Sequence, residues 1–109
     1  MKKAFRIKKA AEIEHVMKTG SVVRNKYLSL FKKENHELRH FRFAISVPKK
    51  YGNAVERNTM KRRIRMIVSQ QTIEALNDFF IVIHPPAKSL SFERLKKVLE
   101  QSMTKLELR

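Results

Sequence analysis

The amino-acid sequence predicts an α/β sandwich of the α+β type with two layers, and two patterns support this prediction. Residues 41–47 alternate between apolar and small or basic side chains, and residues 79–83 form a short apolar run, so both are expected to be strands. Between them, apolar residues recur at helical spacing. Strand, helix and strand in this order normally form a crossover unit with parallel strands. The predicted order is α-β-β-α-β-α, with at most four strands in the sheet.

The chain begins with a predicted basic arm and a short helix. Residues 1–9 form the arm, because five of them are basic: Lys2, Lys3, Arg6, Lys8 and Lys9. The helix that follows has Ile13, Val16 and Met17 on one face. Gly20 suits the end of this helix, because glycine is common just after a last helical turn.

A hairpin and a long helix are predicted next. Residues 22–33 are rich in β-prone side chains, and the polar residues 34–37 are expected to connect them to strand 41–47 as a hairpin. Asn53 and Glu56 are spaced as a capping box, which marks the beginning of a helix of about five turns.

The C-terminal half is predicted to supply most of the core. The long helix carries an apolar stripe of Met60, Ile64, Ile67, Val68 and Ala75. Asn77 and Asp78 are expected to break the pattern before the buried strand 79–83. Ser91 is the expected cap of a last helix with apolar residues at helical spacing, namely Phe92, Leu95, Val98, Leu99, Met103 and Leu106.

The net charge indicates a polyanionic partner. The chain has 25 Lys and Arg against 10 Asp and Glu, a net charge of +15 over 109 residues. Such a charge repels itself unless a polyanion neutralises it, so nucleic acid is the expected partner. There is no apolar run of membrane-spanning length and no lipidation motif, so we expect no membrane partner and a cytoplasmic location. The length fits one RNA-binding domain, residues 1–109.

The most informative segment is a basic face on the long helix. Arg57, Lys61 and Arg65 stand four residues apart and form one ridge, with Asn58 and Arg62 beside it. Guanidinium groups match phosphate oxygens in bidentate geometry, and an asparagine amide suits a 2′-hydroxyl or a base edge. A solvated helix surface is the alternative interpretation, but only one carboxylate accompanies five basic residues. We therefore expect this face to bind RNA.

Residues 49–65 resemble the signature of the bacterial ribonuclease P protein family. That signature is a Lys-Lys pair followed by Gly-x-Ala-Val-x-Arg-Asn-x-x-Lys-Arg-x-x-Arg. Here it reads Lys49-Lys50-Tyr51-Gly52-Asn53-Ala54-Val55-Glu56-Arg57-Asn58-Thr59-Met60-Lys61-Arg62-Arg63-Ile64-Arg65. The resemblance covers most of the chain. It implies the family's α/β sandwich with a left-handed strand-helix-strand crossover, whereas pattern reasoning alone predicts a right-handed one.

The resemblance also implies a function in tRNA processing. Members of this family are subunits of a ribonucleoprotein endonuclease whose RNA carries out the hydrolysis with Mg²⁺. No catalytic residue, held metal or small-molecule substrate is therefore expected on this chain. The residues implied to face the catalytic ribonuclease P RNA are Arg57, Asn58, Lys61, Arg62 and Arg65. A cleft between the first helix and the sheet is implied to receive the single-stranded 5′ leader of precursor tRNA, with Ile13, Met17, Phe31, Lys49 and Lys50 as candidates.

Three departures from the family pattern concern mainly the leader site. Ile13 and Met17 stand where relatives often have aromatic residues, and they stack less well on a base. Phe31 is expected to compensate from the sheet. His84 and the proline after it replace a basic pair that is common in relatives. Pro48 stands where serine is common, and it is expected to affect only the local turn.

Two other functions are weighed against this one. A structural or chaperone RNA-binding protein, such as a small ribosomal protein, has the same composition, and co-purification with ribosomes would support it. A protein-only nuclease would use histidines as acid and base. However, His36 and His40 flank a polar connection and His15 lies on an exposed part of a helix, which favours surface histidines. No metal site is predicted, because Glu12, Glu14 and His15 do not share one helix face.

Overall fold

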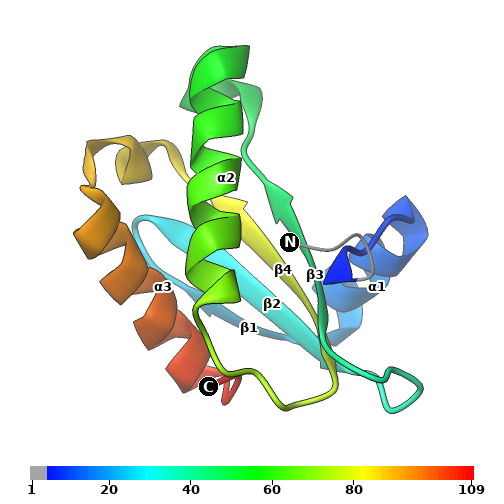
Figure 1. Ribbon diagram of the computed structural model, residues 1–109. Coiled ribbons are helices and arrows are strands. Elements are labelled where there is room, and N and C mark those ends of the chain that lie inside the picture. The colour runs from blue at the N-terminus through cyan, green and yellow to red at the C-terminus, as the bar shows by residue number, and fades with distance from the viewer. Residues whose placement is uncertain (1–4) are drawn as a thin grey trace.

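The structure, a computed structural model, describes residues 5–109 as a four-stranded mixed sheet with helices on both faces (Figure 1). Its main elements are α1 (Ala10–Thr19), β1 (Ser21–Arg24), β2 (Leu28–Glu34), β3 (Arg42–Ser46), α2 (Ala54–Ser69), β4 (Asn77–Ile83) and α3 (Phe92–Lys105). Two short 3-10 turns, η2 (Lys49–Tyr51) and η3 (Pro85–Ser89), precede α2 and α3. Lys2 and Lys3 of the predicted arm lie outside the described residues. Over residues 5–109, every helix is too short or too polar to cross a membrane.

The strand-helix-strand crossover is left-handed. The strand order is β1-β2-β4-β3, and only the β3–β4 pair is parallel. In Figure 1, β3 and β4 both run upward, α2 passes in front of the sheet, and β4 lies to the left of β3. This arrangement has the handedness that the family resemblance implies, and the right-handed crossover expected from patterns alone is wrong.

The predicted order of elements lacked one strand. Residues 22–33 form two strands, β1 and β2, which pair with each other around a turn at Asn25. The Asn25 Oδ1 atom accepts hydrogen bonds from the backbone N–H groups of Tyr27 at 2.8 Å and Leu28 at 3.1 Å, a side-chain turn typical of asparagine. The expected hairpin between residues 22–33 and 41–47 is therefore wrong, because β4 lies between β2 and β3.

Helix α2 is shorter than predicted. It ends at Ser69, so Ala75 belongs to the following loop and not to the helical stripe. The backbone N–H of Gln70 is shared between the carbonyl groups of Met66 and Ile67, a tightening that is common in a last turn. The backbone hydrogen bonds of the last turn are thus complete at Gln70, five residues before Ala75, where the predicted stripe ends.

The two helix caps form as predicted. The Asn53 Oδ1 atom accepts from the Glu56 backbone N–H at 2.9 Å, and Glu56 Oε1 accepts from the Asn53 backbone N–H at 3.0 Å. The Ser91 hydroxyl accepts from the Arg94 backbone N–H at 3.2 Å at the beginning of α3. The capping box fixes the first turn of α2, the helix that carries the basic residues between 57 and 65.

The main core lies between the sheet and the α2–α3 layer. Its fully buried side chains include Leu28, Leu30, Phe43, Met60, Ile64, Ile67, Phe79, Ile81, Ile83, Leu95, Leu99 and Met103. Helix α1 packs on the opposite face of the sheet through a smaller cluster of Val16, Phe31 and Phe80. It therefore adds a partial third layer to the two that were predicted, and the sheet face beside it carries much of the candidate site.

Candidate nucleic-acid interface

The basic ridge of α2, defined as Arg57, Asn58, Lys61, Arg62 and Arg65, lies beside the buried stripe of the helix. Asn58 and Arg62 are exposed, whereas the other three side chains are partly buried. This difference follows from the helix geometry, because Asn58 and Arg62 lie further around the helix axis from the buried stripe than the other three residues. The structure therefore brings together all five residues that the sequence assigns to this surface.

The ridge is not neutralised within residues 5–109. None of its five side chains makes an ion pair there. The single carboxylate of α2 belongs to Glu56, which binds Lys88 at 2.6 Å. In addition, the Nε atom of Arg57 is buried without a hydrogen-bond partner among the described residues. That atom is closed to solvent, but the cationic side chains of the ridge that lack an ion pair are suited to phosphate oxygens supplied by a partner.

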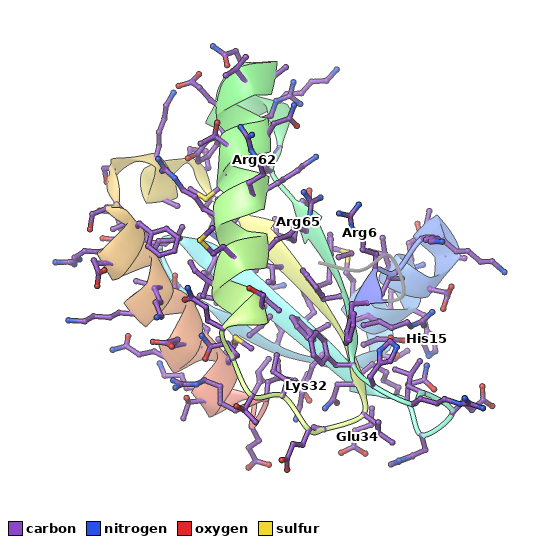
Figure 2. The ribbon with its side chains drawn as sticks, in the orientation of Figure 1. Arg6, His15, Lys32, Glu34, Arg62 and Arg65 are labelled. Carbon is purple, nitrogen blue, oxygen red and sulfur yellow. The ribbon has the colours of Figure 1, made fainter. Side chains whose placement is uncertain are left out.

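A pocket of about 200 Å³ joins the ridge to the α1 side of the molecule. Arg65 and Arg6 lie on its rim, and Ile13, Phe43 and Ala44 contribute to its apolar wall. Figure 2 shows Arg6 and Arg65 on the side of α2 that faces α1. Burial, and then the positive charge of Arg6, lower the pKa of Arg65. An anion between these two guanidinium groups would relieve their repulsion.

The α1 face of the sheet holds three of the predicted leader-binding residues. Ile13 packs against the cluster that contains Phe31, and Met17 is 43% exposed on the same helix. Phe31 is only 6% exposed, because its ring stacks on Phe80 at 6.2 Å and the Arg24 guanidinium covers it at 5.7 Å. The Phe31 ring therefore presents little surface to a ligand, since α1 and the neighbouring strand cover it, and its part in leader binding stays a prediction.

The other two predicted leader residues are placed elsewhere. Lys49 and Lys50 are exposed in η2, beyond the carboxyl end of β3 and next to α2. They extend the basic surface around the first turn of α2 and do not belong to the cluster around Phe31. The structure thus divides the predicted leader set between two neighbouring regions.

Several polar residues of the cleft side were not predicted as site residues. They are Arg24, Ser29 and Ser46, which lie with the apolar Val82 in a single row of the sheet register, on the same face as Phe31. The Ser29 hydroxyl and His84 Nε2 lie 3.0 Å apart at this row. The only sequence signal was the small and polar residues alternating with apolar ones, which predicts a strand face but not its use.

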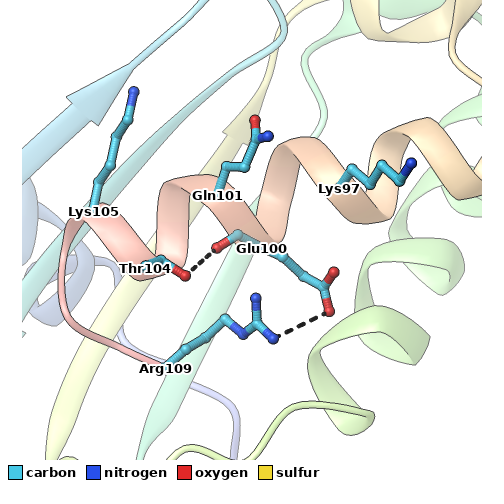
Figure 3. Close-up of a pocket in the computed structure, with 6 residues that line it drawn as sticks. All are labelled: Lys97, Glu100, Gln101, Thr104, Lys105 and Arg109. Atoms are coloured by element: carbon cyan, nitrogen blue, oxygen red, sulfur yellow. Dashed lines mark hydrogen bonds and ion pairs between the residues drawn. The ribbon is translucent and has the colours of Figure 1, made fainter.

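A larger cavity lies on α3 and contains none of the predicted site residues. It has a volume of about 580 Å³ and is lined by Lys97, Glu100, Gln101, Thr104, Lys105 and Arg109 (Figure 3). The carboxylate of Glu100 already accepts from Gln71 at 2.9 Å and pairs with Arg109 at 3.7 Å. Within residues 5–109, no three His, Asp or Glu side chains are grouped as metal ligands would be.

Comparisons with known proteins agree on one family. The family model described as ribonuclease P matches residues 1–107. The ribonuclease P protein component of Macrococcus caseolyticus is 40% identical, over 94% of this chain and 90% of that protein. The component from Phytoplasma australiense is 37% identical, over 99% and 96%.

Solved structures give the same result. The Staphylococcus aureus RNase P protein is 37% identical and superposes with a TM-score of 0.88, covering 97% of this chain and 98% of that one. The Thermotoga maritima RNase P protein shares the fold, with a TM-score of 0.80 at 21% identity over 91% and 96% of the two chains. The left-handed sandwich therefore recurs in relatives of low sequence identity.

Proposed function

This chain belongs to the ribonuclease P protein family, and from that premise we propose that it binds the catalytic RNA through α2 and the precursor-tRNA leader beside α1. It is a protein subunit of ribonuclease P, a ribonucleoprotein endoribonuclease that processes tRNA, and its partner is an RNA. The identity of that RNA as ribonuclease P RNA, the contact with precursor tRNA and a cytoplasmic location are parts of the proposal.

The observation that carries the proposal is the basic ridge of α2 without carboxylate partners. Four cations and one amide project from one side of the helix, and none makes an ion pair within residues 5–109. RNA phosphates would satisfy these donors and release counterions, so binding should weaken steeply with salt. The amide of Asn58 can both donate and accept, which suits a 2′-hydroxyl.

The leader of precursor tRNA would lie along the α1 face of the sheet. Single-stranded nucleic acid binds surfaces that combine cations with flat or apolar side chains. Met17 supplies an exposed apolar side chain, and Arg24 supplies a cation above the Phe31 ring at 5.7 Å. The leader RNA would then pass through the pocket lined by Arg6 and Arg65, from this face of the sheet toward the ridge.

In this proposal the RNA performs the hydrolysis with Mg²⁺, and the protein supplies no nucleophile. The chain would contribute affinity and orientation for the precursor. Its net charge of +15 would also lower the magnesium concentration needed to hold two RNA molecules together. The part of precursor tRNA recognised by the protein would be the leader, which the mature product lacks.

The test is reconstitution of cleavage at low magnesium. A bacterial ribonuclease P RNA is incubated with a 5′-extended precursor tRNA, with and without this protein, alongside a protein-only control. Cleavage at the mature 5′ end only when both are present supports the proposal. Tight RNA binding without stimulation would favour a structural or chaperone RNA-binding protein instead. Cleavage by the protein alone would show that the protein carries the catalytic centre.

A further inference from the structure

Helix α1 borders the proposed binding cleft, but it buries little apolar surface against the sheet. Val16 is its only fully buried side chain, and it contacts the small cluster of Phe31 and Phe80. The first turn of α1 also lacks a side-chain cap, because Lys9 makes no capping hydrogen bond. Apolar burial of this extent leaves the amino-terminal half of the helix dependent on other contacts for its position.

A charged network connects that half of α1 to the sheet. The Arg42 side chain of β3 donates from Nε and Nη2 to the two carboxylate oxygens of Asp78 in β4, both at 2.9 Å. Its Nη2 atom also donates to Glu12 Oε2 in α1 at 2.6 Å. Asn35 donates to the same Asp78 carboxylate at 3.1 Å. The network therefore joins three elements that are distant in the sequence.

The exposure of the three charged side chains shows which of them is held most firmly by the fold. The side chain of Asp78 is 8% exposed, that of Arg42 is 20% exposed, and that of Glu12 is 36% exposed. A buried carboxylate must keep its partner, so the two-pronged bond to Asp78 holds the Arg42 guanidinium in one orientation. The hydrogen bond to Asp78 is also the largest cause that raises the pKa of Arg42. Glu12 thus binds a cation that is already held in place by the sheet.

The network lies beside the pocket that joins the two candidate RNA surfaces. Ile13, which follows Glu12, lines that pocket together with Ala44. Ala44 is on the same face of β3 as Arg42, because the two residues are two positions apart on one strand. A shift of the first turns of α1 would therefore change the width of the cleft directly.

We propose that Glu12 is a positioning residue, which holds α1 against Arg42 and so sets the opening of the cleft for single-stranded RNA. The inference rests on the proposed function in assigning that cleft to the leader. Glu12 itself does not contact the RNA in this proposal. Its removal should weaken binding of the precursor while leaving binding of the ribonuclease P RNA to the α2 ridge unchanged.

The first measurement compares Glu12→Ala with a matched control on the same helix. Glu14 is exposed and makes no ion pair within residues 5–109, so Glu14→Ala changes the net charge equally without touching the network. In the holoenzyme, Glu12→Ala should weaken precursor binding roughly three- to tenfold and leave binding of mature tRNA within about twofold. Glu12→Gln keeps a hydrogen-bond acceptor, so its precursor affinity should lie between that of Glu12→Ala and that of Glu14→Ala. Equal effects of Glu12→Ala and Glu14→Ala would overturn the proposal.

The second measurement reads the position of α1 without any RNA. The chain has no cysteine, so spin labels can be placed at Ala11→Cys in α1 and Gln101→Cys in α3. The distance distribution between the labels should broaden or shift with Glu12→Ala but not with Glu14→Ala. An unchanged distribution would overturn the positioning role. A broadened distribution with unaltered precursor binding would instead show that the cleft does not hold the leader, which separates failure of the proposed function from failure of the inference.

Discussion

Ile13 of α1 and Arg65 of α2 line the same pocket, although the sequence assigns one to the leader site and the other to the catalytic-RNA site. Arg6 completes the rim and lowers the pKa of Arg65 after the larger effect of burial. The two proposed RNA surfaces are therefore adjacent, and the pocket between them carries the guanidinium groups of Arg6 and Arg65. Substitutions on the two sides of the pocket should nevertheless have different effects. Those on α1 should weaken binding of the precursor leader, whereas those on α2 should weaken binding of the catalytic RNA.

Replacement of Arg65 by alanine should weaken assembly with ribonuclease P RNA. Loss of one charged contact to phosphate is expected to cost about 1.5 kcal/mol, roughly tenfold in affinity. The slope of log K against log salt concentration should fall by about 1 unit. Filter binding at several salt concentrations measures both quantities. Arg94→Ala on α3 is the control, since Arg94 is exposed and lies outside the ridge. Equal losses for the two variants would show that only total charge matters.

An aromatic side chain at position 17 should strengthen binding of the precursor. Met17 is 43% exposed beside the proposed leader path, and a phenylalanine there could stack on a base. Base-aromatic stacking contributes about 1–3 kcal/mol per base, so Met17→Phe is expected to increase precursor affinity by roughly three- to tenfold after allowing for loss of the methionine contact. Competition between precursor and mature tRNA for the holoenzyme measures the gain.

Met66→Phe is the matched control for that substitution. Met66 is also an exposed methionine, at 56%, but it lies on α2 outside the ridge. Its replacement should leave the preference for precursor unchanged. If Met17→Phe had no larger effect than Met66→Phe, the leader would not pass over this part of α1.

Local patterns predicted the helices, their caps and the ridge well because each depends on residues close in sequence. Asn53 and Glu56 form their capping box within one turn, and Arg57 and Arg65 share a face through helical periodicity alone. Asp78 was instead expected to break the chain pattern, since a polar residue before an apolar run is typical of a turn. Its place inside β4 depends on Arg42, 36 residues away, which no local pattern reveals.

The same limit explains the strand order and the burial of Phe31. Adjacent strands in sequence usually pair, so β2 and β3 were expected to form a hairpin. Insertion of β4 between them places Phe80 directly opposite Phe31 and allows α1 to cover both rings. Alternation along one strand predicts which residues share a face, but not which element covers that face.

Gly20 should tolerate no side chain, because the end of α1 and strand β2 meet there. A Cβ atom at this position would lie 2.2 Å from the carbonyl oxygen of Lys32 and 2.5 Å from that of Val16. Backbone atoms cannot move as easily as a side-chain end, so Gly20→Ala is expected to lower the free energy of unfolding by about 1–3 kcal/mol. At Gly52, the nearest atoms belong to the flexible Glu56 side chain, and Gly52→Ala should cost less. Urea unfolding of both variants measures the difference, and equal costs would contradict the close approach at Gly20.

The charge of Glu56 should stabilise the fold only above acidic pH. Its hydrogen bond with Lys88, and then that with the Asn53 backbone, lower its pKa from the ordinary 4.5. The unfolded chain therefore binds this proton more readily, so the contribution is complete above pH 4.5 and is lost as pH falls through the folded pKa. Glu56→Gln keeps the capping geometry but not the charge. It should be less stable than the parent at pH 7, and the difference in the free energy of unfolding should shrink as pH falls below 4.5, as measured by urea unfolding.

Glu93→Gln is the control that separates the contacts of Glu56 with Lys88 and Asn53 from the interaction of a carboxylate with the helix dipole. Glu93 lies in the first turn of α3, as Glu56 does in α2, but makes no ion pair within residues 5–109. Both carboxylates interact with a helix N-terminus, whereas only Glu56 binds a lysine and a capping N–H. At pH 7, Glu93→Gln should therefore lower the free energy of unfolding less than Glu56→Gln does. A difference for Glu56→Gln that is the same at pH 7 and pH 3 would show that the Lys88 contact does not persist in solution.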